Sequence, residues 1–473
     1  MMTNYTNYSS YRDALNNSEI TCVDQVKSFL KEIDAQKHLN AFLETFDETA
    51  LAAAQKVDQK LKEGNAGRLA GMVIGIKDNL CYKDHKLSVS SKILSGFTSL
   101  FSGTAVERLI AEDAIIIGRL NCDEFAMGSS NEKSAFGPVL NPYDTTKVSG
   151  GSSGGSAVAV AANLCHASLG SDTGGSVRQP ASFTGTVGLK PTYGRISRWG
   201  LVAYGSSLDQ IGPFTKSVED SALLLEVIAG ADEYDTTAAQ NEVDTYADFK
   251  FEGQKKIAVL RDAIDSEGLS GSVKERFNEI IEKLKSDGHT IEIVDFPLLN
   301  QMVPTYYVVS NAEASSNLSR YDGIHYGYRS EGAKDIQSTY VKSRTEGFGT
   351  EVKRRIMMGT FVLSAGYYDA YFAKAQKVRR LIQDRTKEIF AQYDFIMTPT
   401  TPHVAFELGH NADNPVAMYL EDIFTVHANL AGNPAISLPL GKDKQGMPFG
   451  IQVMAPFFEE KKMFAMADNM MSM

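Results

Sequence analysis

Apolar residues along this chain recur at two spacings, one typical of helices and one of buried strands. Between residues 23 and 33 they return every three or four positions, which predicts an amphipathic helix. Thr21 precedes this pattern and Asp24 lies three positions later, so Thr21 is expected to cap the helix. A second helix is predicted over Thr49–Glu63, with Gly64 as its stop signal. Both precede the first strand that the pattern reveals, so we expect them on the outside of the main sheet.

Short apolar runs then alternate with helical patterns. Strand, helix and strand over 256–260, 272–286 and 290–294 predict a parallel crossover unit. A capping box formed by Thr104 and Glu107 predicts another helix start. The other predicted elements are strands over 72–76, 114–118, 395–397, 435–438 and 451–454, and helices over 217–229 and 361–393. No charged or Pro/Gly-rich linker divides the chain, which favours one α/β domain with a large mixed sheet.

Composition narrows the classes of function. The 473 residues are 43% hydrophobic and 22% charged, with a net charge of −11, which excludes a protein that binds nucleic acid through a basic face of its own. The four cysteines have no metal-ligand or disulfide spacing. No apolar run is long enough to span a membrane, and the first residues do not resemble a signal or transit peptide. We therefore expect a cytoplasmic protein without a metal site.

Two glycine–serine clusters, at residues 150–156 and 174–176, are the strongest candidates for chemistry. A helix-forming segment at 157–162 and a strand between them would bring several serine hydroxyls together. A flexible linker has the same composition, but the helix-forming segment argues against one.

The first cluster matches the G-x-S-x-G pattern over 150–154, yet it follows a turn-rich loop instead of a strand, so a hydrolase nucleophile elbow is not predicted. In the second cluster, the N–H groups of Thr173, Gly174 and Gly175 are candidates to converge on an oxyanion beside Ser176. The alternative for the second cluster is a tight turn chosen for backbone reasons.

Lys77 follows the apolar run at 72–76 and is the candidate base. Burial at the end of a strand would lower the pKa of this amine toward neutrality. The alternative is a surface lysine that pairs with Asp78. From this segment alone the surface ion pair is favoured.

Three motifs taken together point to a known family. They are G-I-K-D-N at 75–79, G-G-S-S-G-G-S-A at 150–157 and G-S-D-T-G-G-S-V-R-Q-P at 170–180. In this order they resemble the amidase signature family. Further stretches at 188–198, 206–213, 319–323, 346–356 and 419–432 resemble its branch of tRNA-dependent amidotransferase A subunits. The resemblance covers residues 8–460 and implies the amidase signature fold as a single domain over 1–473, with an outer helical segment at about 8–65 and the signature core at about 66–215.

The resemblance also implies catalytic roles. Ser176 would be the acyl-enzyme nucleophile, Ser152, held by a cis peptide bond after Gly151, would relay the proton, and Lys77 would accept it. Two positions depart from the family pattern, His427 in place of the more frequent proline and Asn131 in place of the more frequent threonine. Neither departure removes a catalytic group.

Substrate specificity is expected from the second half of the chain. Glutamine carries a carboxylate and an ammonium group, and the resemblance assigns the first to Arg355, the second to Asp422 and the wall of the pocket to Tyr307. A guanidinium suits a carboxylate because its planar fork donates to both oxygens. Arg354 is the alternative carboxylate ligand, and surface ion pairs on a helix would also explain this charged segment.

The implied function is glutamine hydrolysis within a heterotrimer with B and C subunits. Ammonia would pass to a partner subunit that uses ATP and Mg²⁺ to amidate Glu-tRNA(Gln) or Asp-tRNA(Asn), and this chain itself would need no cofactor. The net negative charge of this chain fits such a division of labour between the subunits, because the partner would bind the tRNA. The alternatives are a stand-alone amidase that acts on a small aryl or alkyl amide and an inactive scaffold. The scaffold would be expected to lack one of the three catalytic side chains, all of which are present.

Overall fold

One mixed β-sheet runs through the computed structural model, which describes residues 7–266, 268–410 and 414–473. Its eleven strands lie in the order β1-β3-β2-β4-β6-β5-β10-β11-β9-β7-β8. The strands are β1 (Phe42–Thr45), β2 (Val73–Lys77), β3 (Ile115–Leu120), β4 (Ala167–Asp172), β5 (Val187–Lys190), β6 (Gln210–Thr215), β7 (Lys256–Leu260), β8 (Thr290–Val294), β9 (Phe395–Pro399), β10 (Ala435–Lys442) and β11 (Pro448–Met454). The predicted mixed sheet is confirmed.

Parallel pairing occurs in two groups of strands. β2 pairs in parallel with β3 and β4, and β7 pairs in parallel with β8 and β9. The strands between these groups are antiparallel, and β10 and β11 lie between β5 and β9 although they come last in the sequence. The crossover unit predicted over residues 256–294 is confirmed, because β7 and β8 are parallel.

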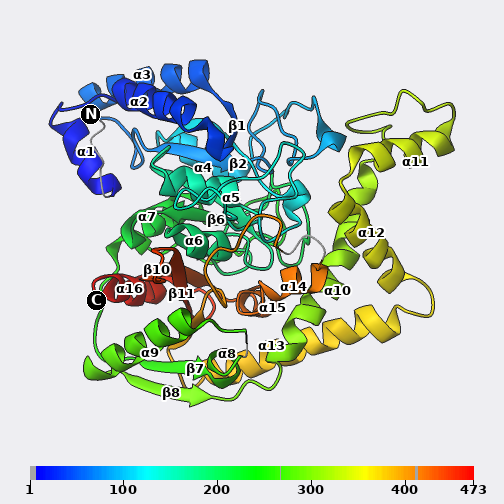
Figure 1. Ribbon diagram of the computed structural model, residues 1–473. Helices are drawn as coiled ribbons and strands as arrows, with labels where there is room; N and C mark the ends of the chain where they lie inside the picture. The colour runs from blue at the N-terminus through cyan, green and yellow to red at the C-terminus, as the bar shows by residue number, and fades with distance from the viewer. Residues whose placement is uncertain (1–6, 267, 411–413) are drawn as a thin grey trace.

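Helices cover both faces of the sheet (Figure 1). Helices α1 to α3 lie at the end of the molecule that carries β1, and α10 to α13 form the opposite side in this view. The helices are α1 (Tyr8–Asn16), α2 (Cys22–Ala35), α3 (Asp47–Glu63), α4 (Thr104–Ala111), α5 (Gly154–Ala161), α6 (Arg178–Thr184), α7 (Val218–Ile228), α8 (Arg261–Ile264), α9 (Gly271–Ser286), α10 (Leu299–Asn317), α11 (Ile336–Gly347), α12 (Thr350–Leu363), α13 (Lys374–Phe390), α14 (Pro415–Leu420), α15 (Val426–Ala431) and α16 (Glu460–Met471). Thr21 caps α2 as predicted, since its hydroxyl accepts a hydrogen bond from the Asp24 N–H at 3.0 Å.

Three sequence-based predictions about elements were wrong. A strand, β1, lies between α2 and α3 and pairs with β3, so the N-terminal helices do not precede every strand. The cap residue of α4 is Gly103, while the Thr104 hydroxyl donates to Asp232 at 2.5 Å and no capping box forms. The predicted helix over 361–393 is broken: α12 ends at Leu363, a π-helical turn follows over Asp369–Ala373, and α13 begins at Lys374.

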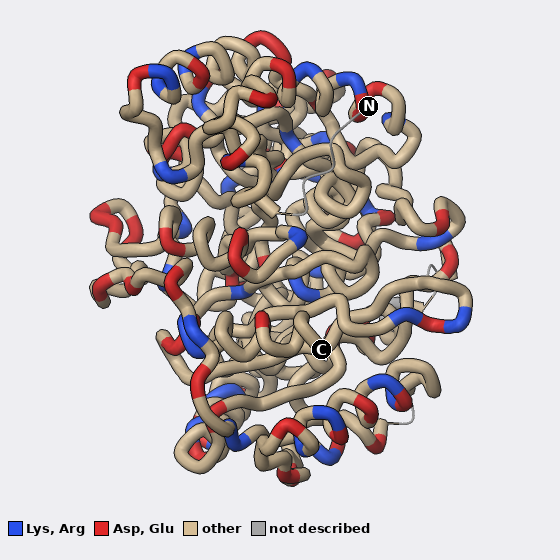
Figure 2. Tube along the Cα trace, turned by 90° about the vertical axis from the view of Figure 1, so that its left-hand side faces the viewer, with Lys and Arg blue, Asp and Glu red and all other residues tan. Residues whose placement is uncertain are grey.

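Charged residues are distributed over the outer helices and loops. Basic and acidic positions are interspersed along the chain on the face shown in Figure 2. No helix within the described ranges is long and apolar enough to cross a membrane. Within the same ranges, no group of three or more His, Cys, Asp or Glu side chains is placed so that it could hold a metal ion.

Candidate active site

Lys77 is the last residue of β2 and is fully buried. Its ammonium group donates to Ser152 and Ser153 Oγ at 2.8 Å and to Ser171 Oγ at 2.9 Å. Burial lowers the pKa of Lys77 to about 8, against the opposing effect of nearby carboxylates. The surface ion pair with Asp78 is excluded, because the Asp78 carboxylate pairs with Arg119 at 2.9 Å.

The two glycine–serine clusters meet at this lysine. The first begins helix α5, and the second follows β4, which pairs in parallel with β2. The Gly151–Ser152 peptide bond is cis, as the resemblance implies. Ser153 N–H donates to the Ser176 carbonyl at 3.3 Å, so the loop that carries the predicted nucleophile lies directly against the first cluster. The structure therefore brings Lys77, Ser152 and Ser176 into one region.

A buried ion pair holds the loop before Ser176, and no local sequence signal pointed to it. Arg178 donates to both carboxylate oxygens of Asp172 at 3.0 Å, and Asn429 Nδ2 donates to Asp172 Oδ1 at 2.9 Å. Burial opposes ionisation of this carboxyl group, but Arg178 and these hydrogen bonds hold the pKa of Asp172 at about 2. The Gly175 N–H donates to the same carboxylate at 2.8 Å.

The predicted oxyanion donors therefore differ in availability. Gly175 N–H is engaged by Asp172, whereas no acceptor within residues 7–266, 268–410 and 414–473 bonds to the N–H of Thr173 or Gly174. The Thr173 hydroxyl donates to Asp209 at 2.7 Å, which fixes the start of the loop. A Cβ atom on Gly174 would overlap the ring of Tyr306, so only glycine fits there.

The three predicted substrate-binding residues converge. Tyr307 OH donates to Asp422 Oδ2 at 3.2 Å, and the Arg355 guanidinium lies 5.2 Å from the centre of the Tyr307 ring. Tyr204 and Tyr419 also flank Arg355, with ring centres 5.7 and 5.4 Å away. Burial raises the pKa of Asp422 to about 7. One buried cluster of side chains thus holds a cation and a carboxyl group of opposite formal charge, with aromatic rings between them.

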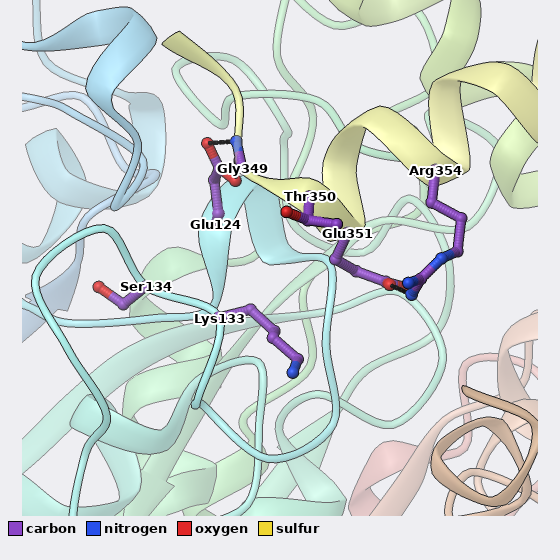
Figure 3. Close-up of a pocket in the computed structure, with 7 residues that line it drawn as sticks. All are labelled: Glu124, Lys133, Ser134, Gly349, Thr350, Glu351 and Arg354. Atoms are coloured by element: carbon purple, nitrogen blue, oxygen red, sulfur yellow. Dashed lines mark hydrogen bonds and ion pairs between the residues drawn. The ribbon is translucent and has the colours of Figure 1, made fainter. Parts of the chain in front are cut away.

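Arg354 and Arg355 point to different environments. Arg355 is buried and donates through Nε to Glu351 Oε1 at 2.8 Å, whereas Arg354 is 43% exposed and pairs with Glu351 Oε2. Glu351 and Arg354 line a polar cavity of about 320 Å³, together with Glu124 and Lys133 (Figure 3). Of the two arginines, only Arg355 belongs to the buried cluster with Tyr307 and Asp422.

Hydrogen bonds connect the cluster of Arg355, Tyr307 and Asp422 with the two glycine–serine clusters. Ser129 Oγ donates to Asp422 Oδ2 at 2.9 Å, and the Ser129 carbonyl accepts from Gln179 Nε2 at 2.8 Å. Gln179 Oε1 in turn accepts from the Gly151 N–H at 3.0 Å. On the other side, Thr425 Oγ1 donates to the Gly174 carbonyl at 2.7 Å.

Asn131 and His427, which depart from the family pattern, occupy buried structural positions. Asn131 N–H donates to Asp123 Oδ2 at 2.9 Å beside the first cluster. His427 Nε2 lies 2.8 Å from Thr386 Oγ1 and its ring packs on Phe296. Burial lowers the pKa of His427 to about 3, so this ring is neutral.

Comparisons with known proteins agree with this geometry. The family model described as Amidase matches residues 24–464. The glutamyl-tRNA(Gln) amidotransferase A subunit of Chlorobaculum parvum is 49% identical over 99% of this chain and 98% of its own length. The crystal structure of the corresponding protein from Thermotoga maritima has a TM-score of 0.77 and 40% identity and covers 94% of this chain and 93% of its own. A native peptide amidase from Stenotrophomonas maltophilia has a TM-score of 0.82 at 26% identity, covering 99% and 96% of the two chains.

Proposed function

We propose, because this chain belongs to the amidase family, that it hydrolyses the side-chain amide of glutamine and supplies the ammonia to a tRNA-dependent amidotransferase. Its similarity to glutamyl-tRNA(Gln) amidotransferase A subunits over nearly the whole chain supports this assignment. One structural observation carries the choice of substrate: Arg355 and Asp422 belong to one buried cluster that is hydrogen-bonded to the serine clusters. A small aryl or alkyl amide carries neither a carboxylate for Arg355 nor an ammonium group for Asp422, so it would gain no charge-assisted hydrogen bond from either residue.

The reaction begins with a proton transfer to Lys77. The neutral amine accepts the proton of Ser152, which takes the proton of Ser176 as Ser176 Oγ attacks the amide carbon. Thr173 and Gly174 N–H groups stabilise the oxyanion, and a donor of this kind contributes about 3 kcal/mol. The proton returns through Ser152 to the leaving nitrogen as the carbon–nitrogen bond breaks. Water then attacks the glutamyl ester, which releases glutamate and restores Ser176.

Recognition of the substrate follows from its zwitterionic end. Arg355 binds the α-carboxylate, and Asp422 binds the α-ammonium with Tyr307 as the wall between them. With its pKa at about 7, Asp422 is only partly ionised near neutral pH, and an incoming ammonium would favour the charged form. Hydrogen bonds from the guanidinium to Glu351 and to the Tyr204 hydroxyl fix its orientation.

We place the chain in a heterotrimer with B and C subunits in the cytoplasm. The partner would bind ATP, Mg²⁺ and Glu-tRNA(Gln) or Asp-tRNA(Asn) and would use the ammonia to amidate the misacylated tRNA. This division agrees with the net charge of −11, because tRNA binding requires a basic surface. The sheet draws strands from both ends of the chain, which supports residues 1–473 as a single amidase domain.

The variant Ser176→Ala tests the proposal in the assembled complex. We expect glutamine-dependent amidation of the tRNA to fall to background while amidation with ammonium chloride continues at the wild-type rate. The measurement is the formation of Gln-tRNA(Gln) or Asn-tRNA(Asn) with ATP and either nitrogen donor. Loss of the ammonia-dependent reaction in a folded complex would contradict the assigned role of Ser176. Turnover of simple amides by the wild-type chain, with no response to partners or tRNA, would overturn the proposed function.

A further inference from the structure

An apolar groove lies between α11 and α12, on the part of the molecule that projects at the upper right of Figure 1. It encloses about 350 Å³ and is lined by Tyr340, Val341, Phe348, Ile356 and Met357 among others. Val341 is 59% exposed and Met357 73% exposed, although both are large apolar side chains. The helix that forms one wall of the groove also carries the buried Arg355.

Exposed apolar side chains continue beyond the groove. Ile336 extends them along α11, and Phe361 extends them along α12 toward Tyr367 and Tyr371. The Phe361 ring lies 4.3 Å from that of Tyr367 and 5.6 Å from that of Tyr371, so these rings form a continuous cluster. Single exposed apolar residues are common, but a contiguous surface of this kind marks a site of interaction with another molecule.

The charged residues of the groove are all basic. They are Arg344 and Lys353. Arg344 donates to the carbonyls of Leu318 and Tyr321 at 2.8 and 2.9 Å, and Lys353 donates to the carbonyl of Thr345 at 3.0 Å. Across the part of the chain that the structure describes, neither cation lies within ion-pair distance of a carboxylate, although Asp322 acts electrostatically on Arg344 and Glu124 on Lys353. Two cations without a direct carboxylate partner therefore lie beside apolar walls in a chain whose net charge is −11.

We propose that this groove is the docking site for an acidic, amphipathic segment of the partner subunit. Its apolar side chains would enter between α11 and α12, and its carboxylates would pair with Arg344 and Lys353. Charge complementarity selects this occupant, because a basic segment would be repelled and a neutral one would leave both cations unpaired. The identity of the partner rests on the proposed function, whereas the chemistry of the segment rests on the groove.

Charge substitutions in the groove test the proposal. We expect Val341→Glu, Met357→Glu and Lys353→Glu each to weaken assembly with the B and C subunits by about tenfold or more, since each places a carboxylate against an acidic, apolar partner. Leu100→Glu is the matched control, because Leu100 is 81% exposed and lies outside the groove, and its effect should stay below about twofold. Assembly is measured by biolayer interferometry, and thermal unfolding of each isolated variant verifies its fold.

Cross-linking identifies the occupant directly. Tyr340 is replaced by the photoreactive amino acid p-benzoylphenylalanine, and the adduct formed in the complex is mapped by mass spectrometry. We expect a cross-link to a segment of the B or C subunit with net negative charge. A cross-link to a basic segment or to a second copy of this chain would overturn the proposal.

The assembly assay separates the two proposals. If the wild-type complex forms and amidates tRNA from glutamine while all three groove variants assemble normally, the docking site is wrong and the proposed function stands. If the wild-type chain neither binds the B and C subunits nor hydrolyses glutamine, both are wrong.

Discussion

The pH dependence of glutamine hydrolysis tests Lys77 as the catalytic base. Burial lowers the pKa of this amine from the ordinary value of 10.5 to about 8. At pH 7 about one molecule in eleven then carries the neutral amine, compared with about one in three thousand for an ordinary lysine. Burial therefore increases the population of the active base about 300-fold at pH 7.

Raising the pH from 7 to 9 should increase the rate. The neutral fraction of Lys77 rises from about 9% to about 91% over this range, so we expect kcat to rise about tenfold and then level off. The rate increases with pH because the deprotonated amine of Lys77 is the active form. The assay follows glutamate release at saturating glutamine, where ionisation of Asp422, with its pKa at about 7, affects KM more than kcat. Ammonia-dependent amidation by the same complex at saturating ammonia is the control, since it does not use Lys77 and saturation removes the effect of ammonium ionisation on the rate.

A kcat that stays flat or falls between pH 7 and 9 would refute this role for Lys77. The variant Lys77→Arg gives a second check, because a guanidinium keeps its charge throughout this range. We expect it to lose glutamine hydrolysis at every pH while the complex retains ammonia-dependent amidation. Hydrolysis by this variant with the wild-type pH profile would assign the base to another group.

Two further substitutions test the predicted substrate-binding residues and the loop that carries Ser176. Arg355→Lys should raise KM for glutamine about 10- to 100-fold in steady-state assays, because one charge-assisted hydrogen bond is worth about 1.5–3 kcal/mol. Arg354→Lys is the control: this residue lies on the exposed side of α12, so KM should change less than about twofold. Asp172→Asn leaves the buried guanidinium of Arg178 without its counter-charge and should lower the free energy of unfolding by about 3–5 kcal/mol, measured with urea.

These substitutions have outcomes that would contradict the structure-based reasoning. Equal KM values for Arg355→Lys and the wild type, or a larger effect at Arg354, would remove Arg355 from the carboxylate site. An Asp172→Asn protein as stable as the wild type would mean that other hydrogen bonds hold the loop without the ion pair.

Amphipathic helices and several short buried strands could be predicted from the sequence, while a helix that is buried on most of its faces could not. Helix α9 appears at nearly its predicted bounds because it buries only one face. Strands β7 and β8 on either side of it also have their predicted bounds. Helix α10 was missed: its buried residues lie on most of its faces, so it has no apolar stripe, and Pro304 within it is ordinarily a helix breaker. The break between α12 and α13 was missed for the opposite reason, since an apolar pattern continues through it.

Prediction of the candidate site from the sequence has a similar limit. Glycine-rich loops and a lysine after an apolar run are local signals, which is why Lys77 and Ser176 could be named as candidates, whereas the role of Ser152 and the relay through it came from the family resemblance. Partners that meet only in the fold have no local signal. Arg178 and Asn429 both donate to Asp172, although Asn429 lies more than 250 positions further along the chain. The aromatic side chains around Arg355 likewise come from separate segments.

The position of β10 and β11 in the sheet has an effect on how the protein matures. These strands leave the ribosome after both β5 and β9, yet they join β5 to β9 in the middle of the sheet. Before they emerge, the strands on either side present unpaired edges, which favours aggregation and slows folding. Thr425, which holds the Gly174 carbonyl, also arrives late. A nascent chain that has not yet reached Thr425 therefore lacks a completed nucleophile loop, and hydrolysis of free cellular glutamine begins only after this late segment has folded into place.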